Sequence, residues 1–276
     1  MSGSVEDDEA DLTRKERREQ ARAARKELEQ AEAASVARRK RLTQLGIVGA
    51  VVVVAIVAIL IATGGGSKTG IPKSTQARYQ TATEVNSLVG GIPQSANVLG
   101  NPNAPVTLQY FGDLECPICK EFTLTSLPSI VQNWVRTGKL KIEYRSMETA
   151  TREPEVFKLQ QVAALAAGKQ NKMWNYVETF YHEQGEEDTG YVNESYLQQL
   201  AQQVPGLDLS KWTSDRSEPA LATEVEGDVQ AANNAGFTGT PAFLIGKTGS
   251  TLKPFDPGTF AEPGPYNEAI EKLLRS

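Results

Sequence analysis

The sequence predicts an α/β fold, and three features of the chain lead to this prediction. The apolar segment 106–111 ends at a Gly-Asp break and leads into a helical pattern that starts at Pro117. Residues 140–146 alternate apolar and charged side chains, as a half-buried strand does. Residues 153–235 then read as helices, and the apolar segment 242–245 follows them. The chain therefore combines a β–α–β unit with a helical block and a later strand.

Charge is distributed unevenly along the 276 residues. The first 44 residues hold 11 Lys/Arg and 10 Asp/Glu, which leaves 18 of the 29 basic and 24 of the 34 acidic residues beyond them. The remainder of the chain is therefore acidic, which argues against nucleic acid as its partner.

Residues 1–44 are rich in Ala, Arg, Lys, Glu and Gln and contain no aromatic residue. Good helix formers without an apolar stripe predict a solvated segment that is partly helical or disordered, and that does not form a core. A docking role in the cytosol is the alternative.

Residues 45–63 are nineteen uncharged residues, mainly Val, Ile, Ala and Leu. As a helix they would cover about 28 Å, close to the thickness of a bilayer's hydrocarbon core. The basic run 38–41 precedes them, so we expect a single-pass signal-anchor with its N-terminus in the cytoplasm and the residues after 63 outside the cytoplasm. A cleaved signal peptide is the alternative, but the charged lead-in and the apolar run are both too long for one.

The stretch that begins at Gly64 is rich in Gly, Ser, Thr and Lys, and residues 64–84 are predicted to be a linker. The globular domain is expected at 85–276. It should open with a short helix or strand and an edge segment over 85–100, followed by a turn-rich stretch at 101–105.

Two helical regions are predicted before the last strand. The first runs from Pro117 to about Arg136, and Pro128 is expected to kink it. The second region is the helical block. His182, the only histidine, lies in it beside acidic residues that would raise its pKa if they are close, and no catalytic triad is indicated. The helices of the block are predicted at 153–168, 171–184, 193–204, 208–214 and 218–235.

The stretch 236–246 runs from a Gly/Thr loop through Pro241 into an apolar strand. An X-Pro bond at such a junction is a candidate for the cis form. A short strand near 251–253 and a helix over 265–274 complete the prediction.

The only two cysteines, Cys116 and Cys119, open a helix directly after a strand. A helix N-terminus stabilises a thiolate on the first cysteine, and two intervening residues let the second sulfur close a small, reducible ring. The predicted chemistry is thiol–disulfide exchange, in which Cys116 attacks or is attacked and Cys119 resolves the mixed disulfide.

Three other interpretations of the pair are weaker. A zinc site needs four ligands, and the chain has two Cys and one His. A structural disulfide normally closes a longer loop. Two inert, reduced core cysteines are the third interpretation. No metal site is therefore predicted.

The order of these segments resembles the thioredoxin fold and, more narrowly, the membrane-anchored DsbA-like thiol:disulfide oxidoreductases of Gram-positive, particularly actinobacterial, envelopes. The resemblance covers about 85–276 and implies that 153–235 is the helical insertion of DsbA-like proteins. The residues that carry the resemblance are Gly91–Gln94, Leu99–Val106, Phe111–Cys119 and Gly239–Phe243.

The resemblance also implies roles for individual residues. Pro241 would be the cis-proline that faces the cysteines, and Thr240 would present its backbone to a bound peptide by strand-like pairing. The redox group would be the cysteine pair itself, with no bound cofactor.

One departure concerns the dipeptide between the cysteines. Strongly oxidising DsbA proteins carry a His there, whereas this chain has Pro117 and Ile118, with Asp113 and Glu115 close by. Without a polar group at Ile118, and with acidic neighbours, the Cys116 thiolate should be less stable and the disulfide a milder oxidant.

The leading functional prediction is oxidation of cysteine pairs in exported proteins. A membrane oxidase of the DsbB or vitamin K epoxide reductase type would re-oxidise the enzyme. A reductase or isomerase with the same fold, and an anchored peptide-binding or chaperone module without turnover, remain as alternatives.

Overall fold

The computed structural model describes residues 74–276. The predicted charged segment 1–44 and membrane helix 45–63 lie outside the described residues. Among the helices within 74–276, none is long and apolar enough to cross a bilayer.

A six-stranded mixed sheet forms the centre of the fold, with strand order β1-β2-β4-β3-β5-β6. Strand β3 (Val106–Gly112) pairs in parallel with β4 (Leu140–Ser146) and antiparallel with β5 (Ala242–Lys247). Gly112 lies opposite Ser146, and Phe111 lies opposite Ala242. The carboxyl ends of β3 and β4 and the amino end of β5 therefore meet at one edge of the sheet, where open α/β sheets place their sites.

The three remaining strands are short. β1 (Gln94–Ser95) and β2 (Val98–Leu99) lie beside β4, and β6 (Lys253–Phe255) lies beside β5. The alternating burial of β4, with every second residue buried, is the pattern on which its prediction rested.

Helix α3 (Pro117–Ile130) continues into a π-helical turn, η1 (Val131–Val135). The Arg136 N–H bonds to the Val131 carbonyl, five residues back, so the hydrogen-bond register changes within the turn that follows Pro128. The last helix is α9 (Gly264–Arg275), and Trp134 on η1 donates its indole N–H to Asn267 on α9 at 2.6 Å.

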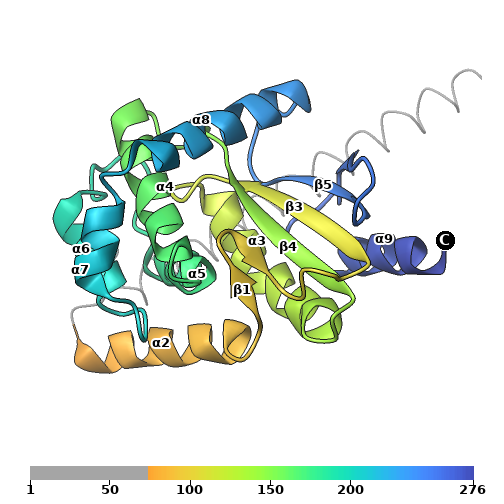
Figure 1. Cartoon of the computed structure of the whole chain (residues 1–276), viewed down its shortest axis with the longest axis horizontal. Helices are drawn as coiled ribbons and strands as arrows, with labels where there is room; N and C mark the ends of the chain where they lie inside the picture. The colour runs from red at the N-terminus through yellow and green to blue at the C-terminus, as the bar shows by residue number, and fades with distance from the viewer. Residues whose placement is uncertain (1–73) are drawn as a thin grey trace, which may run out of the picture. The chain divides into compact units, whose positions relative to one another are not determined.

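The helical block contains five helices, and Figure 1 shows α4 to α7 gathered on one side of β3 and β4. Indole N–H groups join the block internally and to the sheet region: Trp212 donates to the Ala163 carbonyl at 2.8 Å, and Trp174 to the Asn97 carbonyl at 2.9 Å. The five helices are α4 (Pro154–Gly168), α5 (Met173–Glu183), α6 (Glu194–Ala201), α7 (Leu209–Asp215) and α8 (Pro219–Asn234).

Helix α2 (Thr75–Val89) starts inside the stretch predicted as a linker. The hydroxyl of Ser74 caps it by accepting the Ala77 N–H at 3.1 Å. Val85 and Val89 are buried in the main core, so the described fold begins before residue 85. The polar composition of residues 74–84 concealed this helix, because few of its side chains are buried.

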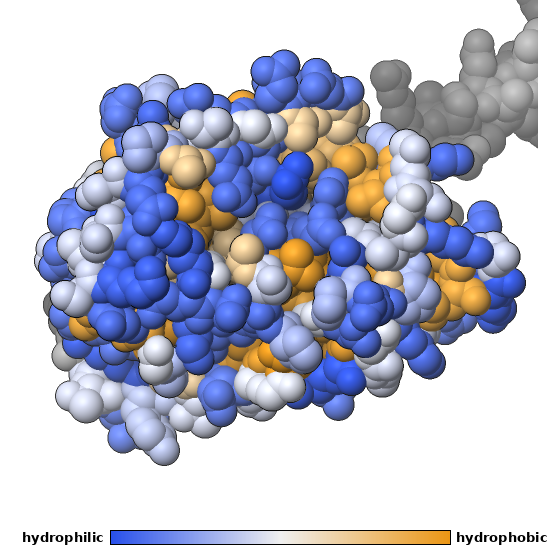
Figure 2. Space-filling view, in the orientation of Figure 1, coloured by the Kyte–Doolittle hydropathy of each residue, from blue (hydrophilic) through white to orange (hydrophobic). Residues whose placement is uncertain are grey.

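The face seen in Figure 2 is mostly hydrophilic, and its hydrophobic side chains appear in separate small patches.

Candidate active site

Cys116 occupies the cap position before the first turn of α3, and Pro117 follows at the first helical position. The Sγ atom of Cys116 accepts the Cys119 backbone N–H at 3.4 Å. Both cysteines are free thiols; Cys116 is 5% exposed and Cys119 is fully buried. Ile118, between the two cysteines, is 42% exposed.

The two thiols differ in acidity. The hydrogen bond with the Cys119 side chain is the largest of the effects that lower the pKa of Cys116 to about 7; a contact with Thr240 also lowers it, and burial opposes both. Burial raises the pKa of Cys119 well above its ordinary value. Cys116 is therefore the sulfur that ionises near neutral pH, and Cys119 stays protonated until the reaction needs it.

The predicted partners on the distant loop reach the motif. The Thr240–Pro241 peptide bond is cis, and Pro241 is buried. The Cys116 Sγ atom donates to the Thr240 carbonyl oxygen at 3.4 Å. The structure thus brings together Cys116, Cys119, Thr240 and Pro241 at the sheet edge described above.

Asp113 has a larger part in this site than the sequence indicated. It is fully buried, and its Oδ2 atom accepts the N–H groups of Thr149, Ala150 and Thr151 at 3.0, 2.9 and 2.9 Å. Its Oδ1 atom accepts the Thr151 hydroxyl at 2.6 Å and the Glu115 N–H at 3.1 Å. Asp113 ties the turn before the cysteines to the loop after β4. The Gly-Asp break after the strand was visible in the sequence, but it does not reveal the partner loop.

Glu115 precedes Cys116 and is 4% exposed. Burial raises the pKa of its carboxyl group to about 7, against a hydrogen bond with Thr151 that lowers it; the charge of Asp113 raises it further. Near pH 7 about half of the Glu115 carboxyl groups are therefore neutral, which limits the negative charge beside the Cys116 thiolate.

The helical block also contacts the redox turn. Gln184, directly after α5, donates its side-chain N–H groups to the Leu114 carbonyl at 2.7 Å and the Cys116 carbonyl at 3.1 Å. The Tyr181 hydroxyl donates to the Asp113 carbonyl at 3.2 Å. Sequence reasoning missed both residues, because nothing local marks a contact across about 70 positions.

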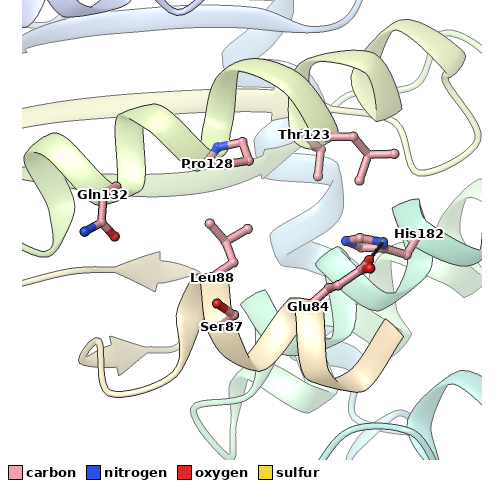
Figure 3. A pocket seen from close by; sticks show the side chains of 8 residues that line it. Glu84, Ser87, Leu88, Thr123, Pro128, Gln132 and His182 are labelled. Atoms are coloured by element: carbon pink, nitrogen blue, oxygen red, sulfur yellow. Dashed lines mark ion pairs between the residues drawn. The ribbon is translucent and has the colours of Figure 1, made fainter. Parts of the chain in front are cut away.

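His182 lines a separate cavity of about 330 Å³ between α2, α3 and α5. Figure 3 shows its ring beside the Glu84 carboxylate, and the two groups are 3.4 Å apart. Burial lowers the pKa of His182 and outweighs the opposing effect of Glu84. Glu84 thus acts on the pKa in the direction predicted for a nearby acid, but the net shift is downward. Among the described residues, no hydrogen bond joins His182 to either cysteine.

A dithiol at the start of a helix, with one acidic and one buried sulfur facing a cis-proline loop, is the site of a thiol–disulfide oxidoreductase with the thioredoxin fold. A family model for thioredoxin matches residues 94–254, more than half of the chain, and the chain belongs to this family. It is a DsbA-like thiol:disulfide oxidoreductase.

Individual relatives agree with this assignment. Disulfide bond formation protein D of Bacillus subtilis is 25% identical over 197 residues, which are 69% of this chain and 83% of that protein. The crystal structure of oxidised BdbD from Bacillus subtilis has a TM-score of 0.57 at 24% identity and covers 68% of this chain and 99% of that one. Alpha-DsbA1 of Wolbachia pipientis has a TM-score of 0.53 at 19% identity over 65% and 90% of the two chains. The two solved structures share the fold.

Proposed function

We propose that this protein inserts disulfides into exported proteins through the Cys116–Cys119 pair. In the oxidised enzyme a substrate thiolate attacks Cys116 Sγ and releases Cys119 as the leaving thiolate. A second substrate thiolate attacks the substrate sulfur of the mixed disulfide and releases Cys116. The substrate loses two electrons and the cysteine pair gains them.

The difference between the two sulfurs is the observation that carries this proposal. A group with a pKa of about 7 leaves readily as a thiolate at neutral pH. Cys116, at 5% exposed against 0% for Cys119, is also the sulfur nearer the solvent. Thr240 and Pro241 would bind the substrate backbone next to it, and Glu115, Pro117 and Ile118 would modulate the pair. The name of the Bacillus subtilis relative, disulfide bond formation protein D, favours disulfide formation as the direction.

The place of action is part of the same proposal. Residues 45–63 would anchor the chain in the cell membrane, with residues 1–44 in the cytoplasm and the domain outside. The uncharged run and the basic residues before it support this arrangement. A membrane oxidase of the DsbB or vitamin K epoxide reductase type would then re-oxidise Cys116 and Cys119.

One observation favours the opposite direction of electron flow, from the cysteine pair to a substrate disulfide. The Cys116 pKa of about 7 is close to the value of about 7 for thioredoxin, a reductant, and above the value of about 3.5 for DsbA. A thiolate that is stabilised less makes the disulfide a weaker oxidant. A reductase or isomerase is therefore the alternative.

The reduction potential decides between these two functions. We would equilibrate the purified whole chain with glutathione mixtures and measure the disulfide fraction by thiol alkylation. A potential between about −200 and −120 mV supports a disulfide donor, and one near −270 mV supports a reductase. Failure to form the Cys116–Cys119 disulfide would exclude both. A Cys119→Ala variant should trap mixed disulfides, which a binding module without turnover would not form.

A further inference from the structure

Three loops meet above the carboxyl end of β3: the redox turn 113–116, the loop 147–153 after β4, and the loop 235–241 before β5. The first two are joined through Asp113, as described above. The second and third are joined at the surface by a hydrogen bond, in which the hydroxyl groups of Thr149 and Thr240 lie 2.5 Å apart.

The Asp113 carboxylate fixes the loop that carries Thr149. Three consecutive backbone N–H groups converge on one carboxylate oxygen, and charge-assisted hydrogen bonds of this kind are among the stronger ones in proteins. The oxygen is buried, so water does not compete for these donors. Thr149 is thereby held at the surface by a group that is itself inaccessible to solvent.

The contact with Thr149 holds Thr240 in place. Its carbonyl oxygen accepts from Cys116 Sγ at 3.4 Å, and its side chain is bonded to Thr149. Within residues 74–276 the Thr240 N–H has no hydrogen-bond partner. A donor of this kind is available to an incoming extended peptide.

We propose that Asp113 and Thr149 are positioning residues for the substrate polypeptide. Asp113 holds Thr149, and the Thr149 hydroxyl holds Thr240, so that a substrate backbone pairs with Thr240 in the register that places its cysteine at Cys116. This inference rests on the proposed function, because it assumes that peptides dock at Thr240. It assigns peptide selection to a pair of hydroxyl groups and a buried carboxylate that do not react themselves.

The test compares a cysteine-containing peptide with dithiothreitol, which has no backbone to pair with Thr240. Thr149→Val keeps the shape of the side chain and removes the hydroxyl, and Thr149→Ser keeps the hydroxyl. The Val variant should lower the ratio of peptide to dithiothreitol kcat/KM by about five- to tenfold, mainly through KM, as expected for one lost hydrogen bond. The Ser variant should restore most of the ratio.

Two further variants sharpen the test. Thr240→Val removes the other half of the same contact, so the double variant with Thr149→Val should be no worse than the more affected single variant. Thr213→Val on α7, an exposed threonine that bonds only within its own helix, is the matched control and should behave as the wild type. Asp113→Asn should lower the same ratio, and the Thr149 variants carry the test if this variant folds poorly.

The possible results separate this inference from the proposed function. An unchanged ratio in Thr149→Val, an equal loss with both substrates, or additive effects of the two Val substitutions would overturn the positioning role and leave the exchange activity standing. A wild-type protein that exchanges with neither substrate would refute the proposed function, and this inference with it.

Discussion

At the scale of the residue, the chemistry depends on how Cys116 is surrounded. Its Sγ atom accepts one backbone N–H, lies against the Thr240 carbonyl and has the second thiol as a neighbour. Ile118 adds no charge or polar group. The thiolate is therefore stabilised by the helix start and by Cys119, and the balance of these effects with burial gives a pKa of about 7.

We predict that the alkylation rate of Cys116 follows this pKa. Only the thiolate reacts, so the rate with iodoacetamide should rise with pH and reach half of its maximum at about pH 7. In Cys119→Ala the largest stabilising contact is lost, and the midpoint should move upward. An unchanged midpoint in that variant would show that the helix start and Thr240 lower the pKa without Cys119. Mass spectrometry of the alkylated peptide identifies the modified sulfur.

At the scale of the element, α2 stabilises the domain although its sequence reads as a linker. It packs against α5, where the Thr81 hydroxyl donates to the Glu183 carboxylate at 2.8 Å. The Arg136 guanidinium, just after η1, donates to the carbonyls at the C-terminal end of α2: Ser87 at 2.7 Å, Leu88 at 2.8 Å and Gly90 at 3.1 Å. This helix end is capped by a distant side chain.

Truncation tests the contribution of α2. A chain that starts at residue 91 loses the buried side chains of Val85 and Val89 and the acceptors of Arg136. Its free energy of unfolding should be about 3 kcal/mol lower than that of a chain that starts at residue 74, as expected from the apolar burial of two Val side chains. Guanidinium unfolding measures the difference. Equal midpoints for the two chains would mean that α2 is dispensable.

At the scale of the whole molecule, the described core contains an ionisable side chain without a hydrogen-bond partner. Glu178 on α5 is fully buried, and among the described residues neither of its carboxyl oxygens has a hydrogen-bond partner. Burial raises its pKa well above the ordinary value, so the folded protein keeps this proton while the unfolded chain releases it above about pH 4. Global stability should therefore fall as pH rises.

We predict that Glu178→Gln stabilises the protein at pH 8 and flattens its pH dependence. Above the unfolded-state pKa, and up to the folded-state pKa, the wild type should lose about 1 kcal/mol of unfolding free energy per pH unit through this group. The variant does not carry the proton and should not show this loss. Denaturant midpoints at pH 5, 6.5 and 8 test it, with Glu268→Gln on the exposed side of α9 as control. A parallel pH dependence of wild type and Glu178→Gln would contradict the prediction.

Much of the fold can be predicted from the sequence where burial has a local period. The alternation in β4 and the apolar runs in β3 and β5 predicted those strands to within one or two residues. The helical block could be predicted as well, because Gly, Pro and acidic turns mark the ends of its helices. Helix α2 was not, because its two buried valines do not distinguish a docked helix from a tether.

The cysteine pair and the cis-proline loop of the candidate site could also be predicted, while the residues that support them could not. Cys116 and Cys119 are a local motif, and Pro241 lies in a recognisable loop. Asp113 and Gln184 act through hydrogen bonds to residues 36 to 38 and 68 to 70 positions away, and sequence spacing contains no information about such pairs. The pKa of His182 shows the same limit, because burial determines the direction of its shift and burial is not visible in the neighbouring residues of the sequence.

The contact between Cys116 and Thr240 spans 124 positions of the chain, which has a consequence for biosynthesis. Ribosomes add about 5 to 20 residues per second, so the two thiols exist for on the order of 10 s before Thr240 has been made. During that interval the nascent chain carries a nucleophile without its carbonyl partner or its central sheet. The enzyme's own cysteines are thus at their most vulnerable to wrong pairing while the protein is still being synthesised.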